Sequence, residues 1–134
     1  MPANQNSSPI VKFTPRPETV TGFIKYWLPV IIYAALIFYL SSIPGEKIPF
    51  LFPYQDVVTH IIEYTIFALL INRALKAYNP DTRYIRRFFW VFFLSFIYAI
   101  SDEFHQIFVP GRCASGSDLF TDAIGSFIGS LIYR

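Results

Sequence analysis

Charged residues are scarce in this chain of 134 residues. Only 15% of the residues are Asp, Glu, Lys or Arg, whereas soluble domains carry about 25%, and 54% are apolar. The length is enough for one domain and too short for two ordinary ones. The small net charge of +2 gives no sign of a nucleic-acid partner. The composition therefore predicts a single integral membrane domain with the lipid bilayer as its main partner.

Cysteine is nearly absent as well. Cys113 is the only one, so no disulfide can form within the chain. The chain also lacks the GxSxG, CxxC and HExxH motifs and any phosphate-binding loop. The sequence therefore points to none of the enzyme or metal-site classes that carry these motifs, and it identifies no cofactor and no metal.

Long apolar runs dominate the rest of the chain. Four of them can cross about 30 Å of hydrocarbon at about 1.5 Å per residue. Before them, residues 1–22 hold four prolines within the first twenty positions and many small polar residues, which predicts a flexible cytoplasmic tail. We expect residues 23–134 to form an all-α, four-transmembrane-helix bundle. Its helices are expected at about 23–42, 56–78, 86–108 and 116–133.

Charge differs between the two ends of this expected bundle. The tail, the 73–87 connection and the C-terminus hold nine basic and two acidic residues, and the other end holds two basic and seven acidic residues. Short loops rich in Lys and Arg stay in the cytoplasm. We therefore expect a multi-pass protein of the inner membrane with both termini in the cytoplasm. The loops 43–55 and 109–117 are expected outside.

Polar side chains recur at helical spacing near the expected outer end. Residues four apart lie on one face of a helix, so each set forms a stripe. The stripes are Asp56, His60, Glu63 and Tyr64 on the second helix, Asp102 and Gln106 on the third, and Asp118 and Asp122 on the fourth. Glu103 and His105 flank the stripe of the third helix. At the same level the first helix ends with Ser41 and Ser42, and the third is followed by a Pro110–Gly111 turn and Arg112.

Two interpretations of these residues remain open. Ionisable residues near the centre of a membrane helix cost roughly 2.5–3.5 kcal/mol each, so they need partners. In the structural interpretation they hydrogen-bond between helices, and Asp118 is an N-cap. In the functional one they line a single pocket, where Asp102, Glu103 and His60 act as acid–base groups or metal ligands and Arg112 holds a phosphate or carboxylate. The other expected binding residues are Ser41, Ser42, Asp56, Tyr64, Gln106, Asp118 and Asp122.

The fourth helix also carries a face of small residues. Gly125 and Gly129 have GxxxG spacing, and Ser126 and Ser130 repeat the spacing beside them. Small residues at this spacing let two helices approach closely. We expect close packing against a neighbouring helix, and a structural or partner-binding module remains an alternative function. The oligomeric state does not follow from the sequence.

Together these motifs resemble the VanZ-like family of small bacterial membrane proteins over about residues 28–134. The shared features are the Ser pair, an Asp-Lys-x-x-His-x-x-x-Tyr pattern, and Asp-Glu-x-x-Gln followed by Pro-Gly-Arg. A fourth helix with an Asp, an Asn four residues later and glycines completes them. This chain departs at two positions, with Val57 in place of the Lys and Asp122 in place of the Asn.

The resemblance implies a role at the cell envelope, because the family is named after a protein that raises resistance to teicoplanin. We therefore expect an envelope membrane protein whose outer pocket binds a lipid-linked or cell-wall-related ligand. The alternative is a membrane-embedded enzyme that carries out acid–base or metal-assisted hydrolysis or transfer on a lipid-linked or phosphate-bearing substrate.

Overall fold

A computed structural model gives the fold and describes residues 19–132. Most of the tail predicted at 1–22 lies outside the described residues. The described part is entirely helical apart from turns and loops, which confirms the all-α prediction. Its elements are α1 (Val20–Tyr26), α2 (Leu28–Ser41), the short 3₁₀ helix η1 (Gly45–Lys47), α3 (Gln55–Tyr78), α4 (Tyr84–Gln106) and α5 (Gly116–Ile132).

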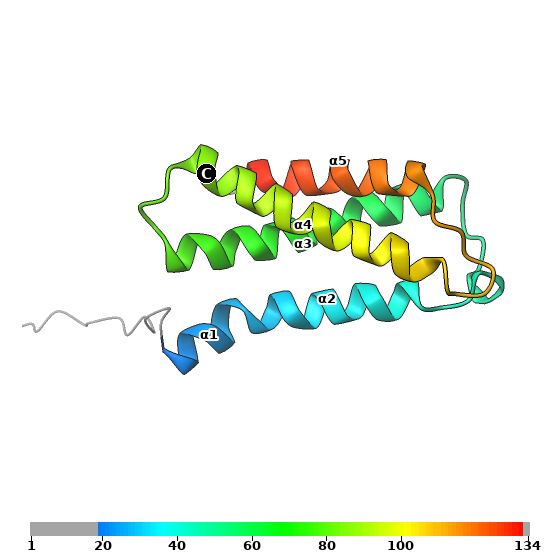
Figure 1. The fold of residues 1–134 in the computed structure, drawn as a ribbon, viewed down its shortest axis with the longest axis horizontal. Helices are drawn as coiled ribbons and strands as arrows, with labels where there is room; N and C mark the ends of the chain where they lie inside the picture. Colours follow the sequence, from blue (N-terminus) through cyan, green and yellow to red (C-terminus); the bar gives the residue numbers. More distant parts are fainter. Residues whose placement is uncertain (1–18, 133–134) are drawn as a thin grey trace, which may run out of the picture.

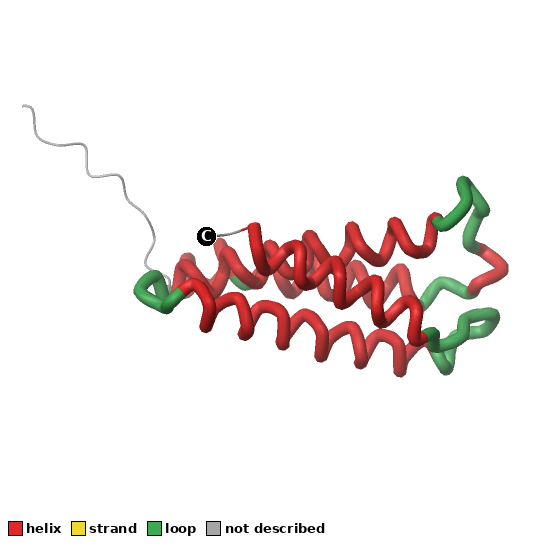
Figure 2. Tube along the Cα trace, turned by 90° about the horizontal axis from the view of Figure 1, so that it is seen from above, coloured by secondary structure: helices red, strands yellow, loops and turns green. Residues whose placement is uncertain are grey.

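The long helices run alternately in opposite directions along one elongated bundle (Figure 1). Segments 42–54 and 107–115 gather at one end, which we call the loop end, while the 79–83 turn lies at the other (Figures 1 and 2). The end of α2, the start of α3, the end of α4 and the start of α5 therefore share the loop end. This alternation of the long helices is the one that the apolar runs predict.

The first expected helix is broken. It is predicted as one piece over 23–42, but the structure has α1 and α2 bent by 40° at Trp27. Pro29 accounts for the break, because it has no N–H and its ring blocks a hydrogen bond to the carbonyl four residues earlier, that of Lys25. Arg73 Nη2 donates to this released carbonyl at 3.3 Å. The prediction of one continuous helix is therefore wrong.

Two helices, α3 and α4, are long and apolar enough to cross a membrane, and the bent α1–α2 pair is a third candidate if it forms one span. The described part of α5 has 17 residues, a length of about 25 Å. Large apolar side chains such as Phe89, Trp90 and Phe93 are exposed along the bundle, where lipid can cover them. These helices are consistent with a bilayer environment.

Glycines bring α5 onto the backbone of α3. A Cβ atom at Gly125 would lie 2.5 Å from the carbonyl oxygen of Ile61, and one at Gly129 would collide with the carbonyl oxygen of Thr65. Both glycines are buried. The predicted close packing of the fourth helix is confirmed, and its neighbour is α3. The small face is thus occupied within the chain.

A buried polar network away from the loop end, which the sequence reasoning missed, connects three helices. Arg87 Nε donates to Asn72 Oδ1 at 2.9 Å, and Asn72 Nδ2 donates to the carbonyl oxygen of Ser130 at 3.1 Å. All three residues are buried. Arg87 was counted only as a cytoplasmic charge, although its side chain is part of the packing between α3, α4 and α5.

Candidate functional site

A cavity of about 230 Å³ lies at the loop end between α2, α3 and α4. Six residues that the sequence analysis selected for binding or catalysis line it: Ser41, Asp56, His60, Asp102, Gln106 and Arg112. The wall is completed by Lys47, Gln55, Thr59 and Glu63 and by the apolar Leu40, Ile43, Ile48 and Pro49. A second hollow of about 330 Å³ shares part of this wall and extends to Asp118 and Cys113.

Asp102 is held from two sides in the cavity wall. Ser41 Oγ donates to Asp102 Oδ1 at 2.7 Å, and Gln106 Nε2 donates to Oδ2 at 3.3 Å. Only 4% of Asp102 is exposed. Both carboxylate oxygens therefore have a partner, and the Ser41 bond links α2 to α4. The hydrogen bonding expected from the structural interpretation is present here.

Two glycines bring the loops of the loop end together. The backbone N–H of Gly45 donates to the carbonyl oxygen of Pro110 at 3.1 Å, and a Cβ at Gly45 would collide with the carbonyl oxygen of Gly111. Gly111 itself has φ +72°, a conformation that glycine adopts without strain. This contact fixes the residue that follows, Arg112, beside the end of α2.

Arg112 projects onto the cavity wall with its orientation set by backbone groups. Its Nε donates to the carbonyl oxygen of Ile43 at 3.2 Å, and its Nη2 donates to that of Leu40 at 3.4 Å. A cation is favoured there because the last carbonyls of a helix carry partial negative charge. Within residues 19–132, no carboxylate oxygen lies within 4 Å of the guanidinium. Its charge is therefore available to an anionic ligand.

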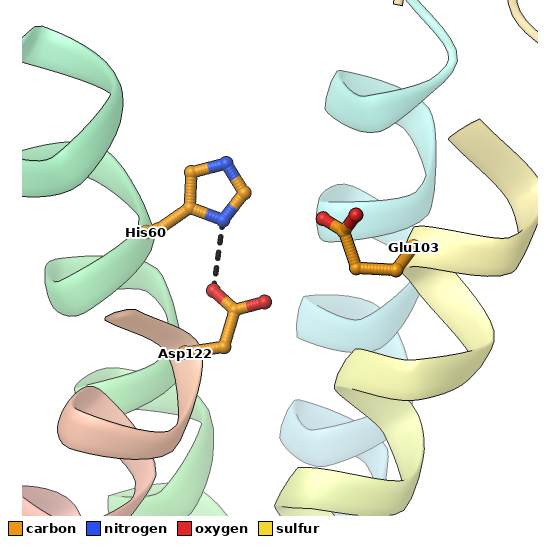
Figure 3. A group of neighbouring side chains, drawn as sticks. All are labelled: His60, Glu103 and Asp122. Atoms are coloured by element: carbon orange, nitrogen blue, oxygen red, sulfur yellow. Dashed lines mark hydrogen bonds and ion pairs between the residues drawn. The ribbon is translucent and has the colours of Figure 1, made fainter. Parts of the chain in front are cut away.

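His60 lines the cavity and also faces two acids from two other helices (Figure 3). His60 Nδ1 and Asp122 Oδ1 share a hydrogen bond of 2.8 Å, which joins α3 to α5. Glu103 of α4 points its carboxylate toward this pair, while its Oε2 accepts the backbone N–H of Ser115 at 2.8 Å. One potential ligand atom from each of these three side chains lies within 4.8 Å of the others.

Three buried side-chain oxygens in this region have no hydrogen-bond partner among the described residues. They are Glu103 Oε1, Asp122 Oδ2 and Tyr64 Oη. Tyr64 is fully buried one helical turn from His60, so it does not reach the cavity that it was expected to line. Unpartnered buried oxygens are uncommon in folded proteins and call for an explanation.

Other predicted site residues lie elsewhere. Ser42 is not among the residues that line the cavity, and it shares a hydrogen bond of 2.9 Å with His105 Nε2. Asp118 is within the first turn of α5, so its predicted role as N-cap is wrong. Ser115, which precedes the helix, accepts the backbone N–H of Ser117 instead. Glu103 was predicted to share one pocket with Asp102 and His60, but it is not among the residues that line the cavity.

Two further polar cavity residues that the sequence reasoning did not select are Lys47, between α2 and α3, and Gln55, the first residue of α3. Lys47 lies in η1 and brings a second cation to the wall. Gln55 accepts the backbone N–H of Leu51 at 2.6 Å and donates to the carbonyl oxygen of Pro49 at 2.9 Å. No periodic pattern marks a residue such as Lys47, which lies outside the long helices, in a sequence. The wall thus carries charges of both signs.

The comparisons with known proteins agree with the motifs. A family model described as VanZ/LLP1 matches residues 26–134, which include the cavity wall and all three residues of Figure 3. No curated protein and no solved structure gave a match. The match covers most of the chain, and the chain therefore belongs to the VanZ/LLP1 family.

Proposed function

We propose that this chain binds a phosphate-bearing, lipid-linked component of the cell envelope in the loop-end cavity. The placement of Arg112 carries the proposal. Its guanidinium lies on the wall, two backbone carbonyls orient it, and no carboxylate of residues 19–132 lies within 4 Å of it. Guanidinium groups suit phosphate because they present several N–H donors in a planar fork.

The remaining charges narrow the class of ligand. Lys47 lies on the same wall as Arg112, while Asp56, Glu63 and Asp102 supply carboxylates. A ligand that carries a phosphate together with an amine or hydroxyl groups can therefore satisfy both signs. Apolar residues at the same wall can contact the glycerol or acyl part of a lipid. A headgroup such as phosphoethanolamine fits this description.

We also propose how the chain lies in the inner membrane. The bent pair α1–α2 forms one span, and α3, α4 and α5 form one span each. Both termini are then in the cytoplasm, and the loop end is outside. The unequal distribution of basic residues supports this orientation. The cavity then opens at the outer leaflet, where envelope precursors and lipid headgroups are both present.

A lipid titration tests the binding. The purified chain in detergent is titrated with short-chain phosphatidylethanolamine, and heat is measured by calorimetry. We expect Arg112→Gln to weaken binding at least about 10-fold, since hydrogen bonds to charged groups contribute about 1.5–3 kcal/mol. Arg86→Gln is the matched control, because Arg86 is an exposed cation at the opposite end. Equal affinities of the two variants would contradict the proposal.

Family membership supports a link to teicoplanin-type resistance. Expression of the chain in a susceptible bacterium should raise the inhibitory concentration of teicoplanin, and Arg112→Gln should remove the increase. An unchanged inhibitory concentration with normal amounts of protein in the membrane would separate this chain from the resistance phenotype.

The enzymatic alternative rests on His60, which lines the cavity beside Asp122. Incubation of the chain with labelled phosphatidylethanolamine, followed by mass spectrometry, distinguishes binding from turnover. Released headgroup that disappears in His60→Gln would favour an enzyme over a binding protein.

A further inference from the structure

We propose that His60, Glu103 and Asp122 bind one divalent transition-metal ion such as Mn²⁺ or Zn²⁺. The three side chains come from α3, α4 and α5 and converge in the interior of the bundle (Figure 3). All three are buried. This inference goes beyond the proposed lipid binding, because it does not depend on which ligand the cavity takes.

The spacing suits a single ion. One nitrogen or oxygen from each side chain lies within 4.8 Å of the other two. Ligand atoms bind divalent cations at about 2.0–2.6 Å, so two ligands on opposite sides of an ion are about 4–5 Å apart. The separation of the three ligand atoms is therefore compatible with one shared ion.

A second observation points to a ligand between these side chains. Glu103 Oε1 and Asp122 Oδ2 are buried without a hydrogen-bond partner among residues 19–132, and their residues are only 6% and 1% exposed. Buried carboxylate oxygens are unfavourable unless they are paired or coordinate a metal. The other oxygen of Glu103 is held by the Ser115 N–H, an interaction of the kind that orients carboxylate ligands.

The donor set decides the class of metal. One imidazole nitrogen with two carboxylate oxygens suits Mn²⁺ or Zn²⁺ better than Ca²⁺ or Mg²⁺, which prefer oxygen ligands alone. The only thiol, Cys113, is exposed outside the cluster. Three protein ligands also leave a coordination position for water, as in zinc sites with three protein ligands.

Metal coordination by His60 can be tested by substitution, because the chain has only two histidines. The full chain is purified with a tag that contains no histidine and is titrated with Mn²⁺. We expect one Mn²⁺ per chain and a nitrogen hyperfine signal in pulsed electron paramagnetic resonance. His105→Gln should keep that signal and His60→Gln should lose it. His105 is the matched control, since it packs on Phe38 and bonds Ser42 instead.

Carboxylate variants complete the test. Glu103→Gln and Asp122→Asn should each weaken Mn²⁺ binding at least about 10-fold, while Asp118→Asn should not. Size-exclusion chromatography reports whether each variant folds. If His60→Gln does not fold, the His105→Gln variant still decides, because His60 is then its only histidine. Absence of stoichiometric Mn²⁺ or Zn²⁺ binding by the wild-type chain, or a nitrogen signal that depends on His105, would overturn the proposal.

Discussion

His60 Nδ1 lies 2.8 Å from Asp122 Oδ1, although the two residues are 62 positions apart in the chain. The bond joins the start of α3 to the start of α5 at the level of the cavity. Below it, glycines hold the same two helices in backbone contact. The close packing of α5 on α3 therefore also sets the position of Asp122 relative to His60.

The glycine contact predicts a position-dependent effect of alanine. Gly129→Ala should lower the free energy of unfolding by about 1–3 kcal/mol, because its Cβ would collide with the Thr65 carbonyl oxygen. Gly116→Ala is the matched control, since nothing lies within 4 Å of a Cβ there. Denaturant unfolding in detergent, followed by circular dichroism, measures both. Equal stabilities would contradict the close contact.

The Ser41–Asp102 bond predicts a stability effect at the cavity wall. Ser41→Ala leaves Asp102 Oδ1 buried without its donor, which should cost about 1–3 kcal/mol. Ser101→Ala should change stability by less than about 0.5 kcal/mol, because Ser101 is exposed and bonds only a carbonyl of its own helix. The same unfolding measurement compares the two. A harmless Ser41→Ala would show that the bond contributes little.

The buried network at the opposite end makes a third prediction. Asn72→Ala removes the acceptor of Arg87 Nε and a donor to Ser130, so it should cost about 2–4 kcal/mol. Asn79→Ala makes the same chemical change at an exposed position and should have a much smaller effect. Thermal unfolding of the two variants in one detergent measures the difference. Similar losses of stability in Asn72→Ala and Asn79→Ala would show that the network does not stabilise the fold.

The orientation can be checked with the native cysteine. Cys113 is exposed at the loop end, so a membrane-impermeant maleimide should label it in intact cells. In a Cys113→Ser background, Ile48→Cys should be labelled from outside and Pro80→Cys should be labelled only after the cells are opened. The reverse pattern would place the loop end in the cytoplasm.

The helices and their alternation could be predicted because long apolar runs joined by short polar segments can be read locally from the sequence. The break at Trp27 could not be predicted in the same way. Pro29 causes it, and the effect of a proline depends on how many helical residues precede it. The structure starts α1 at Val20, so helical residues already precede Pro29, which lies in the first turn of the second piece, α2.

Parts of the site follow from spacing and parts do not. The i, i+4 relation correctly places Asp102 and Gln106 on one face. Glu103 is only one position away but points to a different set of neighbours, because adjacent helical residues are about 100° apart and helix rotation decides what each one meets. The contact of Glu103 with the His60–Asp122 pair depends on packing among three helices, which no single-helix pattern contains.

Photocrosslinking with a phosphatidylethanolamine whose headgroup carries the reactive group tests directly whether the loop-end cavity binds a lipid headgroup. The chain is reconstituted in lipid bilayers, irradiated, and mapped by mass spectrometry. We expect labelling to be concentrated in segments 40–60 and 102–113, and to be lost in Arg112→Gln but not in Arg86→Gln. Labelling spread evenly over both ends of the helices and unchanged in Arg112→Gln would contradict it.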